Sequence, residues 1–176
     1  MYLVSLYFDS KTEEILQRHI DKVAAKTGNT YMQERRIPPH LTVASCRNVR
    51  EEELILALNR CSGAWHTGTV NWAAVGSFKP HVLFLAPVLN QYLHELCLSV
   101  NTAIGRLDGG IDASGHYQPF EWMPHTAVAR TLTEEQMLTG FHVLQTNFQP
   151  FLGDGVKIGL ARSNPYQNLA VWDLAE

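Results

Sequence analysis

The sequence predicts an α+β fold made of two pseudo-symmetric lobes of antiparallel sheet, with outer helices and a central cleft. Three observations support this class. Strand-like and helix-like patterns alternate along the chain, several neighbouring strands are separated only by short turns typical of hairpins, and one strand–helix unit recurs half a chain later. The 176 residues suit a single bilobal domain over residues 1–176.

The first half is predicted to contain two strands, each followed by a helix. Residues 2–8 are rich in branched and aromatic side chains, as expected of a strand, and the segment 10–13 has the pattern of a capping box at a helix start. Gly28 is a suitable end for that helix. After two prolines, residues 40–46 predict a second strand, and Asn48 marks the start of a second helix.

The second half is predicted to hold a strand pair, a long amphipathic helix, a polar loop, a short strand, a further helix and a final hairpin. In chain order these are residues 69–77 with 82–86, 89–107, 108–117, 124–130, 133–148, and 156–162 with 168–174. Because the strand pairs are hairpins, the sheets are expected to be antiparallel rather than doubly wound and parallel.

Composition narrows the class of protein. A net charge of −3 disfavours non-specific DNA binding but leaves room for a local patch that holds a short phosphate ligand. The cysteines, Cys46, Cys61 and Cys97, form no C-x-x-C pair, so neither a disulfide framework nor a cysteine-rich zinc site is expected. The opening Met1–Phe8 lacks the basic start of a signal peptide, and no apolar run reaches the roughly 18 residues of a membrane span. We therefore expect a soluble, cytoplasmic protein.

Two segments of the chain match at the same positions. Residues 39–44 are PHLTVA and residues 124–129 are PHTAVA, which share Pro, His, Val and Ala. From position 40 to position 125 the offset is 85 residues, and it also relates the starts of the helices that follow. Two such units predict pseudo-twofold symmetry, with His40 and His125 facing each other across the cleft.

Strand alternation decides which side chains accompany each histidine. Residues two apart share a face of a strand, so His40 and Thr42 project together. In the second unit His125 shares its face with Ala127, while Thr126 points to the opposite face. A histidine and a hydroxyl are thus paired in the first unit only.

These motifs resemble those of the 2H phosphoesterase superfamily, and within it the bacterial RNA 2′,3′-cyclic phosphodiesterase and 2′-5′ RNA ligase branch. That family carries paired H-x-[ST]-x motifs about half a chain apart, and the resemblance covers essentially the whole chain. His40-Leu41-Thr42-Val43 matches the motif fully. The second motif matches at Pro124, His125, Ala129 and Arg130 but has Ala127 where Ser or Thr is expected.

The resemblance implies metal-independent opening of 2′,3′-cyclic phosphates or 2′-5′ linkages, with no cofactor. His40 and His125 would act as the acid–base pair, since imidazole can hold or release a proton near neutral pH. Thr42 would donate a hydrogen bond to a phosphate oxygen. The implied ligands are an RNA end, a short oligonucleotide or a small cyclic nucleotide, bound by a monomer. Which histidine is the base depends on the direction of reaction, and ligation is the same chemistry reversed.

Further residues are candidates for substrate binding. Arg130 would either contact phosphate or be only a charge near a helix start, and Thr126 would supply the missing hydroxyl if the strand shifted by one residue. Phe120 and Trp122 precede the second motif and are candidates for stacking on a base, with core packing as the alternative. The pair 35–36, both Arg, is either a solvated charge run or a phosphate-steering element.

Two other functions are left open by the sequence. Ala127 is compatible with a catalytically weak or inactive relative that binds a nucleotide or RNA. A metal hydrolase is the second alternative, but the chain has no H-E-x-x-H motif and no carboxylate within four residues of His40.

Overall fold

The computed structural model describes residues 1–79, 81–110 and 116–176, so the predicted loop 108–117 lies partly outside the described residues. Within these ranges helices and strands alternate much as the sequence predicts, but a short helix over residues 31–34 was not predicted, and the first strand of the final hairpin begins at residue 151 instead of 156. Their order is β1 (Tyr2–Phe8), α1 (Ser10–Thr27), α2 (Tyr31–Glu34), β2 (Leu41–Cys46), α3 (Glu51–Ser62), β3 (Gly68–Phe78), β4 (Val82–Pro87), α4 (Gln91–Ile104), β5 (Thr126–Ala129), α5 (Glu134–Asn147), β6 (Phe151–Ser163) and β7 (Tyr166–Asp173).

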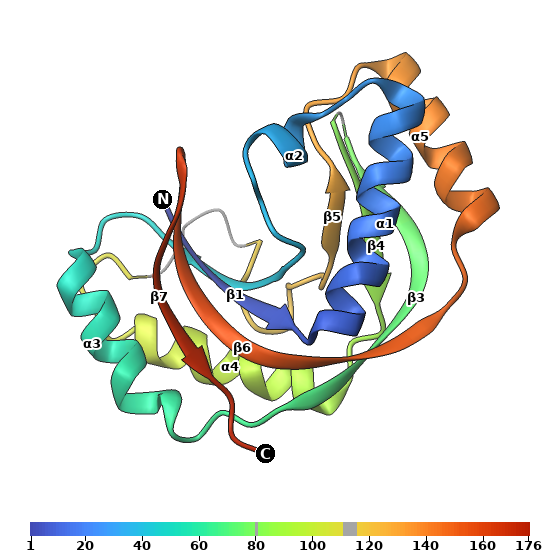
Figure 1. The fold of residues 1–176 in the computed structure, drawn as a ribbon. Coiled ribbons are helices and arrows are strands. Elements are labelled where there is room, and N and C mark those ends of the chain that lie inside the picture. Colours follow the sequence, from blue (N-terminus) through green and yellow to red (C-terminus); the bar gives the residue numbers. More distant parts are fainter. Residues whose placement is uncertain (80, 111–115) are drawn as a thin grey trace.

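The strands form one hydrogen-bonded sheet in the order β2-β1-β6-β3-β4-β5, with β7 also paired to β6. Every pairing between these named strands is antiparallel, which confirms the predicted α+β class. The long strand β6 belongs to both halves: residues 151–155 pair with β3, whereas residues 155–162 pair with β1. Figure 1 shows β6 curving beneath both halves of the molecule. The two lobes are therefore two halves of a continuous sheet that share their central strand.

Two helix pairs cover the two halves. Helix α1 packs against α5 and β5, and α4 packs against α3 and β2, so each pair combines helices from opposite halves of the chain (Figure 1). Apolar side chains between helices and sheet make a continuous core. Its largest fully buried members are Leu6, Leu16, Ile20, Leu41, Leu54, Leu58, Trp72, Leu83, Leu85, Leu93, Ile104 and Leu132. No helix in the described part of the chain is both long and apolar enough to cross a membrane.

The predicted starts of α1 and α3 are wrong by one to three residues, and α4 is shorter at both ends than the helix predicted over residues 89–107. The cap of α1 is Asp9, whose carboxylate accepts the Thr12 N–H at 2.7 Å, so the predicted capping box at segment 10–13 lies inside the helix. Asp9 still has an extended backbone and directly precedes the helix, so its carboxylate can reach the N–H groups of the first helical turn. Helix α3 begins at Glu51 instead of near Asn48, without a side-chain cap.

Two other helix ends are as predicted. Gly28 closes α1 in the left-handed conformation, with φ of 71° and its N–H bonded to the carbonyl of Ala24. Thr133 and Gln136 form a reciprocal capping box at the start of α5. This cap fixes the chain immediately after β5, the strand that follows His125.

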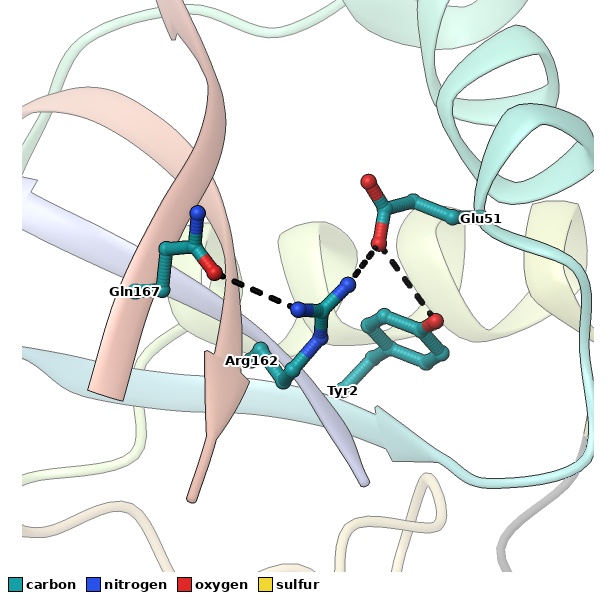
Figure 2. A network of polar contacts seen from close by, with 4 residues as sticks. All are labelled: Tyr2, Glu51, Arg162 and Gln167. Atoms are coloured by element: carbon teal, nitrogen blue, oxygen red, sulfur yellow. Dashed lines mark hydrogen bonds and ion pairs between the residues drawn. The ribbon is translucent and has the colours of Figure 1, made fainter. Parts of the chain in front are cut away.

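A polar network fastens the start of α3 to the sheet (Figure 2). Arg162 of β6 donates to Glu51 at 2.6 Å and to Gln167 of β7 at 3.2 Å, while the Tyr2 hydroxyl donates to the same Glu51 oxygen at 3.5 Å. The ion pair is partly exposed, so solvent screens it and it adds little to stability. The charge of Arg162 is balanced by this network within the fold.

Candidate active site

A β-bulge shapes the strand that follows His40. In the pairing of β2 with β1, Ala44 lies opposite Val4 and Thr42 lies opposite Ser5, so Val43 is an extra residue without a partner position. The backbone carbonyl of Thr42 accepts a hydrogen bond from a tryptophan N–H, and that of Val43 accepts one from an asparagine amide. A bulge bends its strand and redirects the side chains beside it, here those of the His40 motif.

The strand after His125 has the same irregularity. In the pairing of β5 with β4, Ala129 lies opposite Leu83 and Ala127 lies opposite Phe84, which leaves Val128 as the extra residue. Position 128 is position 43 shifted by 85 residues, the offset of the sequence repeat. The repeated sequence therefore folds into repeated local geometry, with both edge strands bent at matching positions.

Both histidines are held by the same hydrogen bond. Nδ1 of His40 lies 2.8 Å from the carbonyl oxygen of Pro38, and Nδ1 of His125 lies 2.9 Å from that of Met123. Because a carbonyl oxygen only accepts, each Nδ1 must carry the hydrogen. The neutral rings then keep a lone pair on Nε2, the form that can act as a base.

The two halves of the sheet enclose one cavity of about 750 Å³. His40, Thr42, His125 and Arg130 all line it, and so does Ala127. The structure thus brings four of the predicted site residues together in one place. The volume lies within the roughly 300–1,000 Å³ of small-molecule sites, so the cavity is large enough for a nucleotide.

Burial is the main influence on both imidazoles. It lowers the pKa of His40 and of His125, against the opposing effect of the carbonyl bond at each Nδ1. The positive charge of Arg130 lowers the pKa of both histidines further, and His125 also lowers that of His40. Both rings are therefore mainly neutral at pH 7, and an anion bound beside them would favour protonation.

Comparison with known families agrees with this geometry. A model of the 2′-5′ RNA ligase superfamily matches residues 12–165, which is most of the chain. The chain belongs to this superfamily. This membership supports an enzyme of the phosphoesterase or ligase type. A search of curated protein sequences finds no match.

Several solved structures share the fold of this chain at low sequence identity. Escherichia coli LigT in complex with 3′-AMP has a TM-score of 0.66 at 17% identity, covering 99% of this chain and 98% of LigT. TT0787 of Thermus thermophilus has a TM-score of 0.65 at 13% identity, over 98% of this chain and 97% of its own. A crystal structure described as a phosphoesterase has a TM-score of 0.65 at 16% identity, over 99% and 98%.

The two halves of the cavity differ at the positions two residues after each histidine. Thr42 shares a hydrogen bond with Ser5 across the strand pair, with their oxygens 3.3 Å apart. At the equivalent place in the second half, Ala127 lies opposite Phe84, whose ring centroid is 5.4 Å from that of His125. The first half therefore presents a pair of hydroxyls beside its histidine, and the second presents a pair of apolar side chains.

Sequence reasoning missed Ser5 and Tyr7, both on β1. The Tyr7 ring lies 6.3 Å from that of His40, and its hydroxyl lies 2.7 Å from the Tyr166 hydroxyl and 3.2 Å from Oδ1 of Asn168. Burial, together with Tyr166, raises the pKa of Tyr7, which stays a neutral phenol. The apolar strand pattern around Ser5 and Tyr7 did not indicate these contacts, because both residues contact side chains of strands that are distant in the sequence.

Three predicted binding residues lie outside the cavity lining. Thr126 is fully buried on the opposite face of β5 and accepts the indole N–H of Trp72 at 3.2 Å. Trp122 is buried and donates its indole N–H to the Thr42 carbonyl at 3.1 Å, which makes it part of the core behind the site. Phe120 is 85% exposed, with φ of 71°, and its ring contacts His94.

The described residues contain no group of three His, Cys, Asp or Glu side chains arranged to hold a metal ion. Within the cavity the charged side chains of the described lining are cations, namely Arg35, Lys79 and Arg130, without an aspartate or glutamate among them. The cavity is thus suited to an anionic ligand.

Proposed function

We propose that this enzyme is a metal-independent phosphodiesterase that opens 2′,3′-cyclic phosphates or 2′-5′ linkages in RNA ends or small nucleotides. One observation carries the proposal. His40 and His125 line the same cavity, each with Nδ1 bonded to the carbonyl two residues before it and with Nε2 left for substrate. Two such imidazoles are the groups needed to take one proton and give another.

Opening of a cyclic phosphate follows from this arrangement. One neutral Nε2 accepts a proton from water as the water oxygen forms a bond to phosphorus. The other imidazole, protonated, donates its proton to the ribose oxygen as the bond from phosphorus to that oxygen breaks. After the reaction the histidine that acted as base is protonated and the one that acted as acid is neutral. Proton exchange with solvent restores the starting state. Since burial lowers the pKa of each ring, the acidic form is best populated after the phosphate anion has entered.

Thr42 and Arg130 stabilise the negative charge that grows on the non-bridging oxygens. The Thr42 hydroxyl is shared with Ser5, so Ser5 can accept from it or orient it towards the ligand. Arg130 brings a fixed positive charge whose influence reaches both imidazoles. Its backbone carbonyl accepts from the Asn29 side chain at 3.1 Å, which ties the end of β5 to the segment after α1.

The test is turnover of 2′,3′-cyclic nucleotides and 2′-5′ dinucleotides by the purified chain, with and without chelator. His40→Ala and His125→Ala are each expected to lower kcat by about 10²–10⁴-fold, the usual effect of losing one positioned acid or base. Chelator should leave the rate unchanged. Full activity in either variant, or loss of activity with chelator, contradicts the proposal.

His81→Ala is the matched control. Nδ1 of His81 also bonds a backbone carbonyl, that of Leu132, at 2.8 Å, but His81 is not part of the described cavity lining. Its removal costs a similar backbone contact without removing a reacting group. We expect the control to keep its kcat even if its Tm falls.

A catalytically weak relative that holds a nucleotide is the second candidate, favoured by Ala127 at the place of the second hydroxyl. It predicts that 3′-AMP binds the cavity while 2′,3′-cyclic AMP is not turned over. Calorimetric binding measured beside the turnover assay separates the two functions.

A further inference from the structure

The cavity holds more positive charge than one phosphodiester requires. Arg35, Lys79 and Arg130 line it, although the chain as a whole has a net charge of −3. A phosphodiester carries one negative charge, and in the proposed function Arg130, which lines the cavity with His40 and His125, stabilises that charge. Two fixed cations, Arg35 and Lys79, are left over, and in the described residues neither forms an ion pair with a carboxylate.

The backbone sends two adjacent arginines to different places. Helix α2 ends with the Arg35 N–H bonded to the Tyr31 carbonyl at 3.3 Å, and Arg36 then adopts a left-handed φ of 51°. The Ile37 N–H bonds back to the Met32 carbonyl at 3.0 Å and closes the turn. As a result Arg35 lines the large cavity, whereas Arg36 lines a separate groove of about 350 Å³.

The Arg35 side chain is organised for an anion. Its guanidinium carbon lies 4.6 Å from the centroid of the Tyr31 ring, and Tyr31 also lines the cavity. Stacking on an aromatic face restrains a guanidinium while leaving its in-plane N–H groups available to bind phosphate. Lys79 enters from the turn between β3 and β4, directly after Phe78, whose ring centroid is 4.8 Å from that of His125.

We propose that Arg35 and Lys79 bind phosphate groups beyond the one that reacts, so that the preferred substrate is a nucleotide carrying at least two phosphates. The identity of the reacting phosphate rests on the proposed function. The additional phosphate comes either from the next internucleotide linkage of an RNA or from a 5′-phosphate on the same nucleoside. Both sources present the same oxyanions to a guanidinium or an ammonium.

Calorimetry with ligands that are not turned over tests this directly. The probes are adenosine 3′-monophosphate, adenosine 3′,5′-bisphosphate and the 3′-phosphorylated dinucleotide ApAp. We expect at least one of the two longer probes to bind about tenfold more tightly than the monophosphate, as for a partly solvated charge-assisted contact. Which of the two gains affinity identifies the source of the second phosphate.

Arg35→Met and Lys79→Met should remove this gain and leave monophosphate binding within about twofold of the parent. Arg36→Met is the matched control, because it removes the same charge from the neighbouring residue outside the cavity, and it should retain the gain.

Equal binding of all three probes by the parent, or an equal loss for all three in the variants, overturns the second-phosphate sites. A gain that is also lost in Arg36→Met overturns them too, because it reports net charge alone. Selective binding without turnover of any cyclic nucleotide contradicts the proposed function and leaves the phosphate sites standing.

Discussion

Residue 127 is where the side chains lining the two halves of the cavity differ most in their chemistry. Thr42 and its cross-strand partner Ser5 form a hydroxyl pair, and Ala127 and its partner Phe84 replace both members at the equivalent positions. The change is therefore shared by two strands and is not an isolated loss. It leaves hydroxyl support for a bound phosphate on the His40 side only.

Ala127→Ser is expected to raise kcat for 2′,3′-cyclic nucleotides, because Ala127 lines the cavity and a serine hydroxyl would reach the ligand. The gain should stay below the roughly 10²–10³-fold worth of a full oxyanion donor, since Arg130 already supplies charge there. Ala127→Thr should gain less, as the Phe84 ring lies opposite. Thr42→Ala should then cost more in the parent than in the serine variant. A serine variant with unchanged Tm and no gain in kcat would contradict this account.

Thr126 offers the complementary prediction, because it is the neighbouring hydroxyl that faces the core. Thr126→Val keeps the shape but leaves the buried Trp72 indole N–H without its acceptor, which costs about 1–3 kcal/mol of unfolding free energy. The parent kcat should be retained. Thr126→Ser, which keeps the acceptor, should recover most of that free energy in denaturant unfolding. A large kinetic loss in Thr126→Val at unchanged stability would mean that the strand register is different.

The bulges in the edge strands determine which segments of the chain contact the His40 motif. The bulge at Val43 frees two successive carbonyls, and the side chains of Trp122 and Asn101 bond them from outside the sheet. Trp122 comes from the segment just before β5, so the first motif is held in place by the second half of the chain. We infer that Trp122 positions Thr42, since it bonds the Thr42 carbonyl but is not part of the described cavity lining.

Trp122→Phe tests this positioning role. The variant keeps an aromatic core residue but loses the donor to the Thr42 carbonyl, so both stability and kcat should fall, with KM changed little. A shift in site geometry is expected to lower kcat by about tenfold or more. Trp65→Phe is the matched control, because it loses an indole bond of the same length, 3.1 Å to Ser99, away from the cavity. Equal kinetic effects in both variants would assign Trp122 to general stability alone.

Sequence patterns found the strands, the helices other than the short α2, and four of the cavity residues, because strands, longer helices and the repeated motif are local signals. Alternation also placed Thr126 on the far face correctly. The bulges at Val43 and Val128 carry no local signal, since a bulge exists only relative to the partner strand. For the same reason the roles of Ser5 and of Trp122 were out of reach, as each depends on a contact between distant segments.

At the scale of the whole molecule, the shared strand β6 and the interleaved helix pairs hold both edge strands around one charged cavity. The electrostatics of the site is consequently a property of the two halves together. Arg130 follows β5 in the second half, yet its charge lowers the pKa of His40 in the first half as well as that of His125. The pH dependence of catalysis should report this coupling.

The rate constant kcat/KM follows the ionisation of the free enzyme, so its bell-shaped profile should centre below the ordinary histidine pKa of about 6.5. Burial is the main cause of that displacement, and Arg130 adds to it. Removing the positive charge in Arg130→Gln makes protonation of both rings easier, so both limbs of the profile should move to higher pH even though the rate itself falls. Arg130→Lys keeps the charge and should keep the parent profile. If the limbs of Arg130→Gln stay where the parent has them, Arg130 does not act on the imidazoles that carry the reaction.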